Sequence, residues 1–225
     1  MTDLVIFDLD HTLIADDSDV LWVGYLYEQG LLDDAFMRTR DAYFDDYQAG
    51  TLDIDAFLTF QLAILAKFDK QQLDALYQPF FQQHILPKIY PEAVTLIEQH
   101  QARGDTLLLL SATNEFIITP IAHHLGIKNV IGVALETDSQ GNFTGCYLGV
   151  PSFQQGKVTR LQQWLANQNK CLQDYENSYF YSDSRNDIPL LNLVDCPIAT
   201  NPDKQLLITA QNKGWQVIHF APISI

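Results

Sequence analysis

Two aspartates, Asp8 and Asp10, stand directly after the apolar run at residues 4–7. Such a run is typical of a buried strand, and ionised carboxylates are rarely left unpaired at its end. One interpretation is an acidic loop supported by the hydroxyl of Thr12. The other is chemical: a nucleophile and a general acid would share Mg²⁺, which neutralises the pair and lets one carboxylate attack phosphorus.

A hydroxyl-bearing segment follows a second apolar run. Residues 106–110 are followed by Ser111, Ala112, Thr113 and Asn114. Just before a helix, a hydroxyl and backbone N–H groups suit an anion. Taken alone, the same segment is an ordinary helix N-cap.

A lysine and a second acidic pair complete the set. Gly156 and Lys157 open a predicted helix, and Asp183 and Asp187 follow the apolar run at 179–182. The lysine would balance the charge of phosphate and aspartate, although a single lysine is more often solvated surface. The two acids would be a direct metal ligand and an outer anchor, or only a capping arrangement. Because Asp pair, Ser, Lys and Asp pair come in this order at successive strand ends, we expect one site.

These side chains need a scaffold that brings strand ends together. Strands are expected at residues 4–7, 106–110, 179–182, 197–199 and 216–219. Helices are expected at residues 91–103, 156–168 and 203–213, because Pro91 suits a first helical turn and Gly104 and Gly214 suit helix ends. This alternation predicts an α/β fold with a doubly wound parallel sheet. A β-hairpin is expected at residues 132–148, with its turn at 139–142.

One region breaks the alternation. It shows no strand-like run but has helical patterns at residues 21–29, 33–49, 53–67 and 70–85, with an expected kink at Pro79. We therefore expect an inserted α-helical cap at residues 16–87 and a catalytic core formed by residues 1–15 and 88–225. Since ligands bind beyond the carboxyl ends of parallel strands, the cap would cover the site as a lid.

The composition excludes several classes of partner. The 225 residues carry 13 basic and 28 acidic side chains, a net charge of −15, and show no basic cluster. Phosphate backbones and anionic membranes repel such a surface, so we expect no nucleic acid and no membrane partner. Cys146, Cys171 and Cys196 lack metal-ligand and disulfide spacing, and MTDLVIFDLD shows no targeting pattern, which predicts a cytoplasmic protein.

The oligomeric state stays open between monomer and homodimer. Aromatic side chains are frequent in the expected cap, and they would form either its core or a dimer face. The core is the simpler expectation for Trp22, Tyr25, Tyr27, Phe36, Tyr43, Phe44 and Tyr47.

The ordered motifs resemble those of the haloacid dehalogenase superfamily of aspartate-nucleophile phosphohydrolases. FDLDHTL, SATNEF, GKVTRL and YSDSRNDIPLL are typical of its phosphoserine-phosphatase-like branch, which has a helical cap after the first motif. The resemblance covers essentially the whole chain, from Asp8 to the helix at Asn201-Pro202-Asp203. It implies a Mg²⁺-dependent phosphomonoesterase that acts on a small metabolite phosphate through an aspartyl-phosphate.

The resemblance also implies which residues do the chemistry. Asp8 would be the nucleophile. Asp10 would protonate the leaving alcohol and then deprotonate the attacking water. Asp8, the backbone carbonyl of Asp10 and Asp183 would bind Mg²⁺. His11 is given no role.

Further motif residues are expected at the phosphate. Ser111, the Ala112 N–H and Lys157 would hold the transferring phosphoryl group, whose spread negative charge calls for fixed positive partners. Asn186 and Asp187 would orient the phosphate and the water ligands of the metal.

The substrate is expected to carry a positive charge. Phosphoserine phosphatases of this branch contact the substrate ammonium through a glutamate, where this chain has Asp17. They contact its carboxylate through a cap arginine, but residues 53–61, where that helix aligns, contain no Arg or Lys. Residues 16–86 carry 13 acidic and 4 basic side chains, a net charge of −9, which disfavours a carboxylate even if most of these acids are solvated. L-histidinol phosphate, which has no carboxylate, is the expected substrate, with phosphoserine as the alternative.

Proteins of another class remain an alternative. Receiver domains that signal through a phosphorylated aspartate also combine Asp, Ser or Thr, and Lys, and a phosphate-binding module needs a similar anion site. The length, the inserted helices and Asp10 favour an enzyme, because a switch needs neither a lid nor a general acid.

Overall fold

A seven-stranded sheet forms the centre of the molecule. The computed structural model describes residues 2–223 and places the strands in the order β4-β3-β2-β1-β5-β6-β7. The parallel strands are β1 (Leu4–Phe7), β2 (Thr106–Asn114), β3 (Asn129–Thr137), β5 (Ser178–Ser182), β6 (Cys196–Thr200) and β7 (Gln216–Ile218). β4 (Phe143–Leu148) pairs antiparallel with β3 at one edge. The sheet confirms the predicted α/β class, and β3 and β4 confirm the predicted hairpin.

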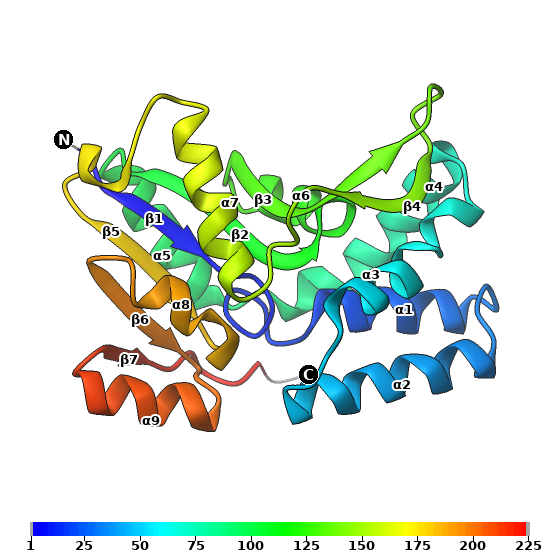
Figure 1. Ribbon diagram of the computed structural model, residues 1–225, viewed down its shortest axis with the longest axis horizontal. Helices are drawn as coiled ribbons and strands as arrows, with labels where there is room; N and C mark the ends of the chain where they lie inside the picture. Colours follow the sequence, from blue (N-terminus) through cyan, green and yellow to red (C-terminus); the bar gives the residue numbers. More distant parts are fainter. Residues whose placement is uncertain (1, 224–225) are drawn as a thin grey trace.

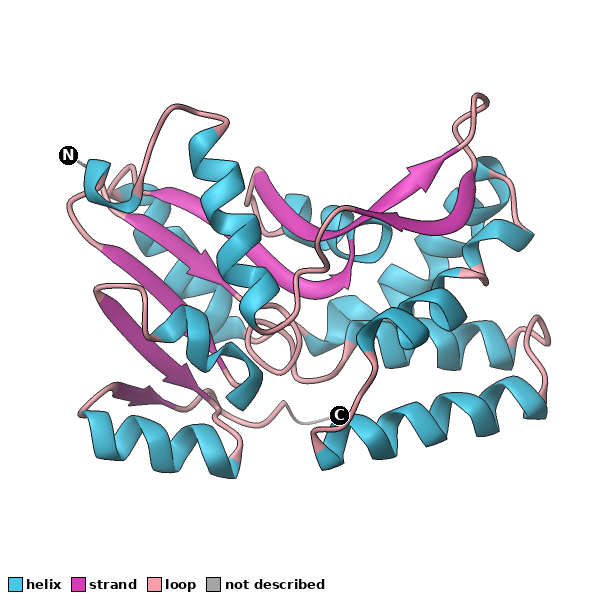
Figure 2. Cartoon of the chain, in the orientation of Figure 1, coloured by secondary structure: helices cyan, strands magenta, loops and turns pink. Residues whose placement is uncertain are grey.

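The residues of β1 explain why both faces of the sheet are covered. All four are apolar and buried, and alternate side chains of a strand point to opposite faces. Leu4 and Ile6 belong to one apolar cluster, with side chains of α7 (Gln155–Ala166), α8 (Ile188–Leu191) and α9 (Lys204–Lys213). Val5 and Phe7 belong to the other, with α5 (Pro91–Ala102) and α6 (Glu115–His124). Figure 2 shows the strands between these two layers of helices.

The chain between β1 and α5 contributes no strand to the sheet. It forms α1 (Ser18–Glu28), α2 (Asp34–Ala49), α3 (Ile54–Leu62) and α4 (Lys70–Phe80). Each of these helices begins after an aspartate whose carboxylate accepts hydrogen bonds from the first turn, namely Asp17, Asp33, Asp53 and Asp69. Part of the acidity of this segment therefore serves helix capping.

Three of these helices differ from the predicted ranges. The helix expected at residues 21–29 begins earlier, at Ser18, and ends at Glu28. The helix expected at residues 53–67 ends at Leu62, and a 3₁₀ turn follows at Leu65–Lys67. The helix expected at residues 70–85 passes through Pro79 and changes to a π-helical turn at Phe81–Ile85. Proline has no N–H to donate, and the hydrogen-bonding pattern widens directly after it.

The helical segment lies beyond the carboxyl ends of the central strands. In Figure 1, β1 and β6 point toward the side on which α1, α2 and α3 lie. The hairpin reaches the same side, where the Tyr147 hydroxyl donates to Asp55 Oδ1 over 2.6 Å. Arg185, after β5, donates to the backbone oxygen of Tyr47 on α2 over 3.3 Å. These contacts hold the helices close to the strand ends without filling the space between them.

Two features of the composition are visible in the structure. Within residues 2–223, no helix is both long and apolar enough to cross a membrane. Cys146 and Cys171 are exposed, Cys196 is half-buried, and all three are free thiols. The expectation of no disulfide is therefore confirmed.

Candidate active site

Asp8 and Lys157 form a buried ion pair at the end of β1. Lys157 Nζ donates to Asp8 Oδ1 over 2.8 Å and to Asp187 Oδ2 over 2.7 Å. The lysine is only 3% exposed, and Asp187 also accepts from Ser182 Oγ over 2.7 Å. Burial alone would lower the pKa of Lys157, but Asp187 and Asp8 together raise it above its ordinary value. Three of the predicted site residues thus meet around one ammonium group.

Gly156 allows Lys157 to reach this position. A Cβ atom at Gly156 would lie 1.9 Å from the backbone oxygen of Pro151, so any other residue requires the backbone to move. The same loop is tied to the end of β2, because Ser152 Oγ donates to the Ser111 backbone oxygen over 2.6 Å. The glycine therefore brings the first turn of α7 against the carboxyl edge of the sheet.

Asp10 is held by two neutral donors. Ser18 N donates to Oδ1 over 2.7 Å, and Thr113 Oγ1 donates to Oδ2 over 2.8 Å. His11 adopts a left-handed backbone conformation with φ of 55°, which turns the loop after Asp10. Burial, and then Asp17, raise the pKa of Asp10 to about 6 against the effect of its donors. A carboxyl group with such a pKa exchanges protons near neutrality, which suits acid–base catalysis.

Asp183 lies near Asp8 at the end of β5. Thr12 Oγ1, from the loop after β1, donates to Asp183 Oδ1 over 3.3 Å. Burial raises the pKa of Asp183 well above its ordinary value, and Asp8 and Asp187 raise it further. Burial also raises the pKa of Asp8 to about 7, although Lys157 opposes the shift. The single positive charge of Lys157 therefore does not balance the negative charges of Asp8, Asp183 and Asp187.

The donor set fits a hard divalent cation. Asp8 and Asp183 offer carboxylate oxygens and Asp10 offers a backbone carbonyl, the kind of ligand that Mg²⁺ takes. Among residues 2–223, no three His, Cys, Asp or Glu side chains gather to hold a metal by themselves. The expected Mg²⁺ ligands differ from such a cluster, since only two of them are carboxylates. A backbone carbonyl and water molecules would fill the remaining coordination positions. The fit rests on this set of oxygen donors and on the charge balance, because one lysine, Lys157, faces three carboxylates, those of Asp8, Asp183 and Asp187.

The expected phosphate-binding residues line the same cavity. β2 continues to Asn114, and Asn114 rather than Ser111 caps α6 through its Oδ1 atom. The Ser111 hydroxyl, which accepts from Thr113 N over 3.1 Å, and Ala112 therefore lie at an irregular strand end beside the cavity. Asn186 also lines the cavity, and its Oδ1 accepts from Gln154 Nε2 over 3.1 Å.

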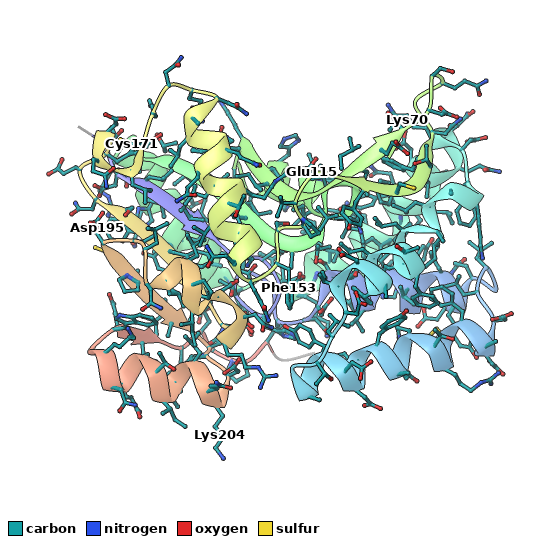
Figure 3. All side chains as sticks on the ribbon, in the orientation of Figure 1. Lys70, Glu115, Phe153, Cys171, Asp195 and Lys204 are labelled. Atoms are coloured by element: carbon teal, nitrogen blue, oxygen red, sulfur yellow. The ribbon has the colours of Figure 1, made fainter. Side chains whose placement is uncertain are left out.

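A cavity of about 250 Å³ lies between these strand ends and the helical segment. Seven aspartates contribute to its wall, namely Asp8, Asp10, Asp17, Asp19, Asp41, Asp183 and Asp187. Phe153, labelled in Figure 3, contributes from the loop before α7, with its ring 6.3 Å from that of Tyr47. Residues from both sides of the molecule thus form one enclosure.

The aromatic residues of the helical segment do not all lie in its core. Tyr27, expected there, is 40% exposed. Trp22 and Tyr25 are buried in the apolar core, as expected. Tyr43, Phe44 and Tyr47 instead line the cavity, although they were expected in the core as well. Their spacing in α2 places them along one side of the helix, which faces the strand ends.

The structure also shows which further residues of the helical segment reach the cavity. Asp17 lines the cavity as expected, but its Oδ1 accepts from the N–H groups of Asp19 and Val20 as the N-cap of α1. Asp19 and Gln61 line the cavity too. Asp16, Asp17 and Asp19 stand next to the Asp8–Asp10 loop, and for this reason the sequence favours these three among the cap acids for a role beyond solvation. Gln61 had no such signal, because a helical glutamine is usually solvated.

The chain is similar to known proteins over almost its whole length. It is 51% identical over 221 residues to a histidinol-phosphatase of Neisseria meningitidis serogroup C, covering 98% of this chain and 100% of that protein. A crystal structure of a protein with unknown function from Bordetella pertussis matches with a TM-score of 0.91 and 41% identity, covering 97% and 98% of the two chains. A substrate-bound phosphoserine phosphatase matches with a TM-score of 0.67 and 16% identity, covering 100% and 95%, which shows a shared fold.

A family model matches most of the chain as well. The model of haloacid dehalogenase-like hydrolases covers residues 5–192, from β1 to the end of α8. The match spans both acidic pairs, Lys157 and the whole helical segment. The chain therefore belongs to the haloacid dehalogenase-like hydrolase family.

Proposed function

We propose that this phosphatase hydrolyses L-histidinol phosphate, a step of histidine biosynthesis, through an aspartyl-phosphate formed on Asp8. The observation that carries the mechanism is the buried contact of Asp8, Lys157 and Asp187 in the cavity that Asp10 also lines. The Neisseria relative, a histidinol-phosphatase, supports the substrate. The family match favours turnover over signalling through a stable phosphoaspartate.

Asp8 acts as the nucleophile in this proposal. The hydrogen bond from Lys157 holds Oδ1 and so orients the carboxylate. Attack forms a bond between an Asp8 oxygen and phosphorus while the bond from phosphorus to the ester oxygen breaks. Water then attacks the same phosphorus, and the release of phosphate restores the Asp8 carboxylate.

Asp10 moves the protons of both steps. In the first step it donates a proton to the leaving alcohol oxygen, and in the second it accepts one from the attacking water. Its raised pKa of about 6 lets both protonation states occur near neutral pH. Ser18 and Thr113 keep its carboxyl group oriented in each state.

Fixed donors hold the phosphoryl group. The Ser111 hydroxyl, the Ala112 N–H and the Lys157 ammonium are proposed to bind its oxygens as charge spreads over them. Asp8, the Asp10 backbone carbonyl and Asp183 would hold Mg²⁺, which would neutralise negative charge on the nucleophile and the phosphate. Asp187 keeps Lys157 in place, and Asn186 is proposed to orient the phosphate.

The helical segment is proposed to act as a cap domain. Residues 16–87 would form the cap, and residues 1–15 and 88–225 the catalytic core. The cavity between them supports this division, because its wall draws on both parts. A cap in this position excludes bulk water and offers side chains to the part of the substrate away from phosphorus.

Phosphoserine remains the second candidate because of Arg40. This cap arginine lines the cavity, where it is able to meet a substrate carboxylate. Its guanidinium, however, already donates to Asp41 through Nε and Nη2. With seven aspartates in the same wall, a substrate without a carboxylate is favoured.

Phosphate release from three esters tests the proposal. With Mg²⁺ present, kcat/KM for L-histidinol phosphate is expected to exceed that for phosphoserine by about 10-fold or more, since only phosphoserine brings a carboxylate into the acidic cavity. 4-Nitrophenyl phosphate serves as the reference, because the part of it beyond the phosphate carries neither a cation nor a carboxylate. Faster turnover of phosphoserine would contradict the proposed substrate.

The nucleophile is tested in the same assay. Asp8→Asn is expected to lower kcat by about 10³-fold or more for all three esters, because no aspartyl-phosphate forms. Asp74→Asn, an equal loss of charge at an exposed position of α4, is the matched control. Full turnover by Asp8→Asn would rule out the proposed mechanism.

A further inference from the structure

Two buried oxygen atoms in the cavity wall have no hydrogen-bond partner among the described residues. They are Oδ1 of Asp19, on α1, and Oε1 of Gln61, on α3. Both residues line the cavity, and neither oxygen is exposed to solvent. A buried acceptor without a donor is unfavourable, and two of them in the wall of one cavity call for a ligand that donates.

The two side chains belong to one arrangement. A side-chain hydrogen bond from Gln61 lowers the pKa of Asp19, and the amide nitrogen is the only donor that Gln61 has there. Oδ1 of Asp19 and Oε1 of Gln61 both remain without a partner beside this contact. Oδ1 and Oε1 are thus both left to accept from whatever enters the cavity.

Asp19 also forms no ion pair with any of the residues that the structure describes. The lysine and the arginine of the cavity wall are engaged elsewhere, Lys157 with Asp8 and Asp187 and Arg40 with Asp41. Burial, and then Asp17, raise the pKa of Asp19 to about 8 in spite of Gln61. A positively charged donor would satisfy both the unpaired oxygen and the charge.

Asp17 is less suited to this task than Asp19. Its Oδ1 accepts two hydrogen bonds as the N-cap of α1, over 2.9 Å and 3.0 Å. The Asp17 carboxylate therefore already accepts the hydrogen bonds that cap α1. Asp19 comes two residues later, inside the first turn, and its carboxylate has no capping bond to make.

The remaining wall suits a flat cation. Tyr43, Tyr47 and Phe57 line the cavity with Asp19 and Gln61. The faces of aromatic rings attract cations and pack against planar groups. An ammonium group and a protonated imidazole both supply N–H donors with positive charge, and the imidazole adds a flat ring.

We propose that Asp19 and Gln61 form the subsite that binds the N–H groups of a cationic substrate and sets the preference of the enzyme for it. This inference rests on the proposed function, since it concerns the non-phosphate part of the same substrate. It assigns recognition of the cation to a residue two positions beyond Asp17. Asp19 and Gln61 take no part in the chemistry at phosphorus.

The test is a selectivity ratio. We define it as kcat/KM for L-histidinol phosphate divided by kcat/KM for 4-nitrophenyl phosphate, which has no cation. Asp19→Asn is expected to lower the ratio by about 10-fold or more, chiefly through KM for L-histidinol phosphate. Gln61→Met, which removes the acceptor at similar size, is expected to lower it about 3-fold or more. Asp45→Asn, an exposed position on α2 with the same charge change, is the control.

Inhibition by L-histidinol gives a second readout, because this product lacks phosphate and relies on the cation subsite. Its inhibition constant against 4-nitrophenyl phosphate is expected to rise about 10-fold in Asp19→Asn. Wild-type selectivity retained in both Asp19→Asn and Gln61→Met would overturn the inference while leaving the proposed function intact. A wild-type enzyme that does not prefer L-histidinol phosphate to 4-nitrophenyl phosphate would overturn both. If Asp19→Asn does not fold, Gln61→Met decides alone.

Discussion

At the scale of single residues, Lys157 sets the charge balance of the site. Its ammonium group is bonded to two buried carboxylates, Asp8 and Asp187. Removing the lysine would leave both acids without that partner, and breaking a buried ion pair destabilises proteins by about 3–5 kcal/mol. The proposed catalytic role of Lys157 is therefore coupled to stability. A substitution at Asp10 distinguishes the effect on catalysis from the effect on stability better, because the donors to Asp10 are the neutral groups of Ser18 and Thr113 and no buried cation loses its partner.

Asp10→Asn tests the proposed proton transfers. Without the general acid, kcat for L-histidinol phosphate is expected to fall about 10²- to 10⁴-fold, since an alkoxide is a poor leaving group. 4-Nitrophenolate leaves without a proton, so the first step should survive with 4-nitrophenyl phosphate while hydrolysis of the intermediate slows. Rapid-mixing measurements should then show a stoichiometric burst of 4-nitrophenolate before slow turnover. Equal losses for both esters without a burst would contradict the role of Asp10 as acid.

At the scale of elements, close approaches position the site. The loop before α7 folds against Gly156, which leaves no room for a Cβ atom, and Ser152 ties this loop to Ser111. On the other side, Tyr147 of β4 bonds to Asp55 of α3, so the hairpin holds the helix that carries Gln61. The side chains of the site are thus placed by contacts between elements far apart in the chain.

Gly156→Ala is expected to damage both the fold and the activity. The new Cβ would meet the Pro151 oxygen at 1.9 Å, so the backbone must shift, at a cost of about 1–3 kcal/mol in the free energy of unfolding. Because Lys157 is the next residue, its ammonium should move away from Asp8 and kcat should fall. Urea unfolding and the phosphate-release assay measure the two effects.

Gly24→Ala provides the control for this substitution. Gly24 lies within α1, and a Cβ there would meet no atom within 4 Å. Alanine should therefore leave stability unchanged or raise it by up to about 1 kcal/mol. If Gly156→Ala and Gly24→Ala changed the free energy of unfolding and kcat equally, the close approach at Gly156 would not be what positions Lys157.

At the scale of the whole molecule, the net charge of −15 has several physical sources. Some aspartates cap helices, as Asp17 and Asp33 do. Others gather at the cavity, where burial raises the pKa of Asp10 to about 6, of Asp8 to about 7 and of Asp19 to about 8. In the folded chain these carboxylates therefore repel one another, and the strength of the repulsion depends on pH and on bound cations.

The metal-free protein is expected to lose stability as the pH rises. The folded pKa values of Asp8, Asp10 and Asp19 lie above their ordinary value of 3.8, so the folded state binds protons that the unfolded chain has released. Their contribution is complete below that value and is lost as the pH passes through about 6 to 8. Burial lowers the pKa of His100, so this residue contributes stability that increases as the pH rises. It is one group, and the three aspartates outweigh it. With EDTA present, Tm should therefore be lower at about pH 8 than at about pH 5.5.

Mg²⁺ should reverse this trend. Binding requires ionised carboxylates, so the increase of Tm caused by Mg²⁺ should be larger at about pH 8 than at about pH 5.5. Asp183→Asn, which removes one proposed ligand, should reduce that increase. An increase of Tm independent of pH and of Asp183 would contradict the proposed metal site.

The sequence by itself determined the sheet, the inserted helices and the residues that are proposed to do the chemistry. Apolar runs define buried strands, and the carboxyl ends of parallel strands meet at one edge, so Asp8, Ser111 and Asp183 had to come together. Only the tertiary structure decided the rest. It assigned Asp17 to a helix cap, turned one side of α2 toward the cavity, and left the oxygens of Asp19 and Gln61 unpaired. These outcomes depend on how separate elements pack, and local patterns of residues carry no signal for a contact between α1 and α3.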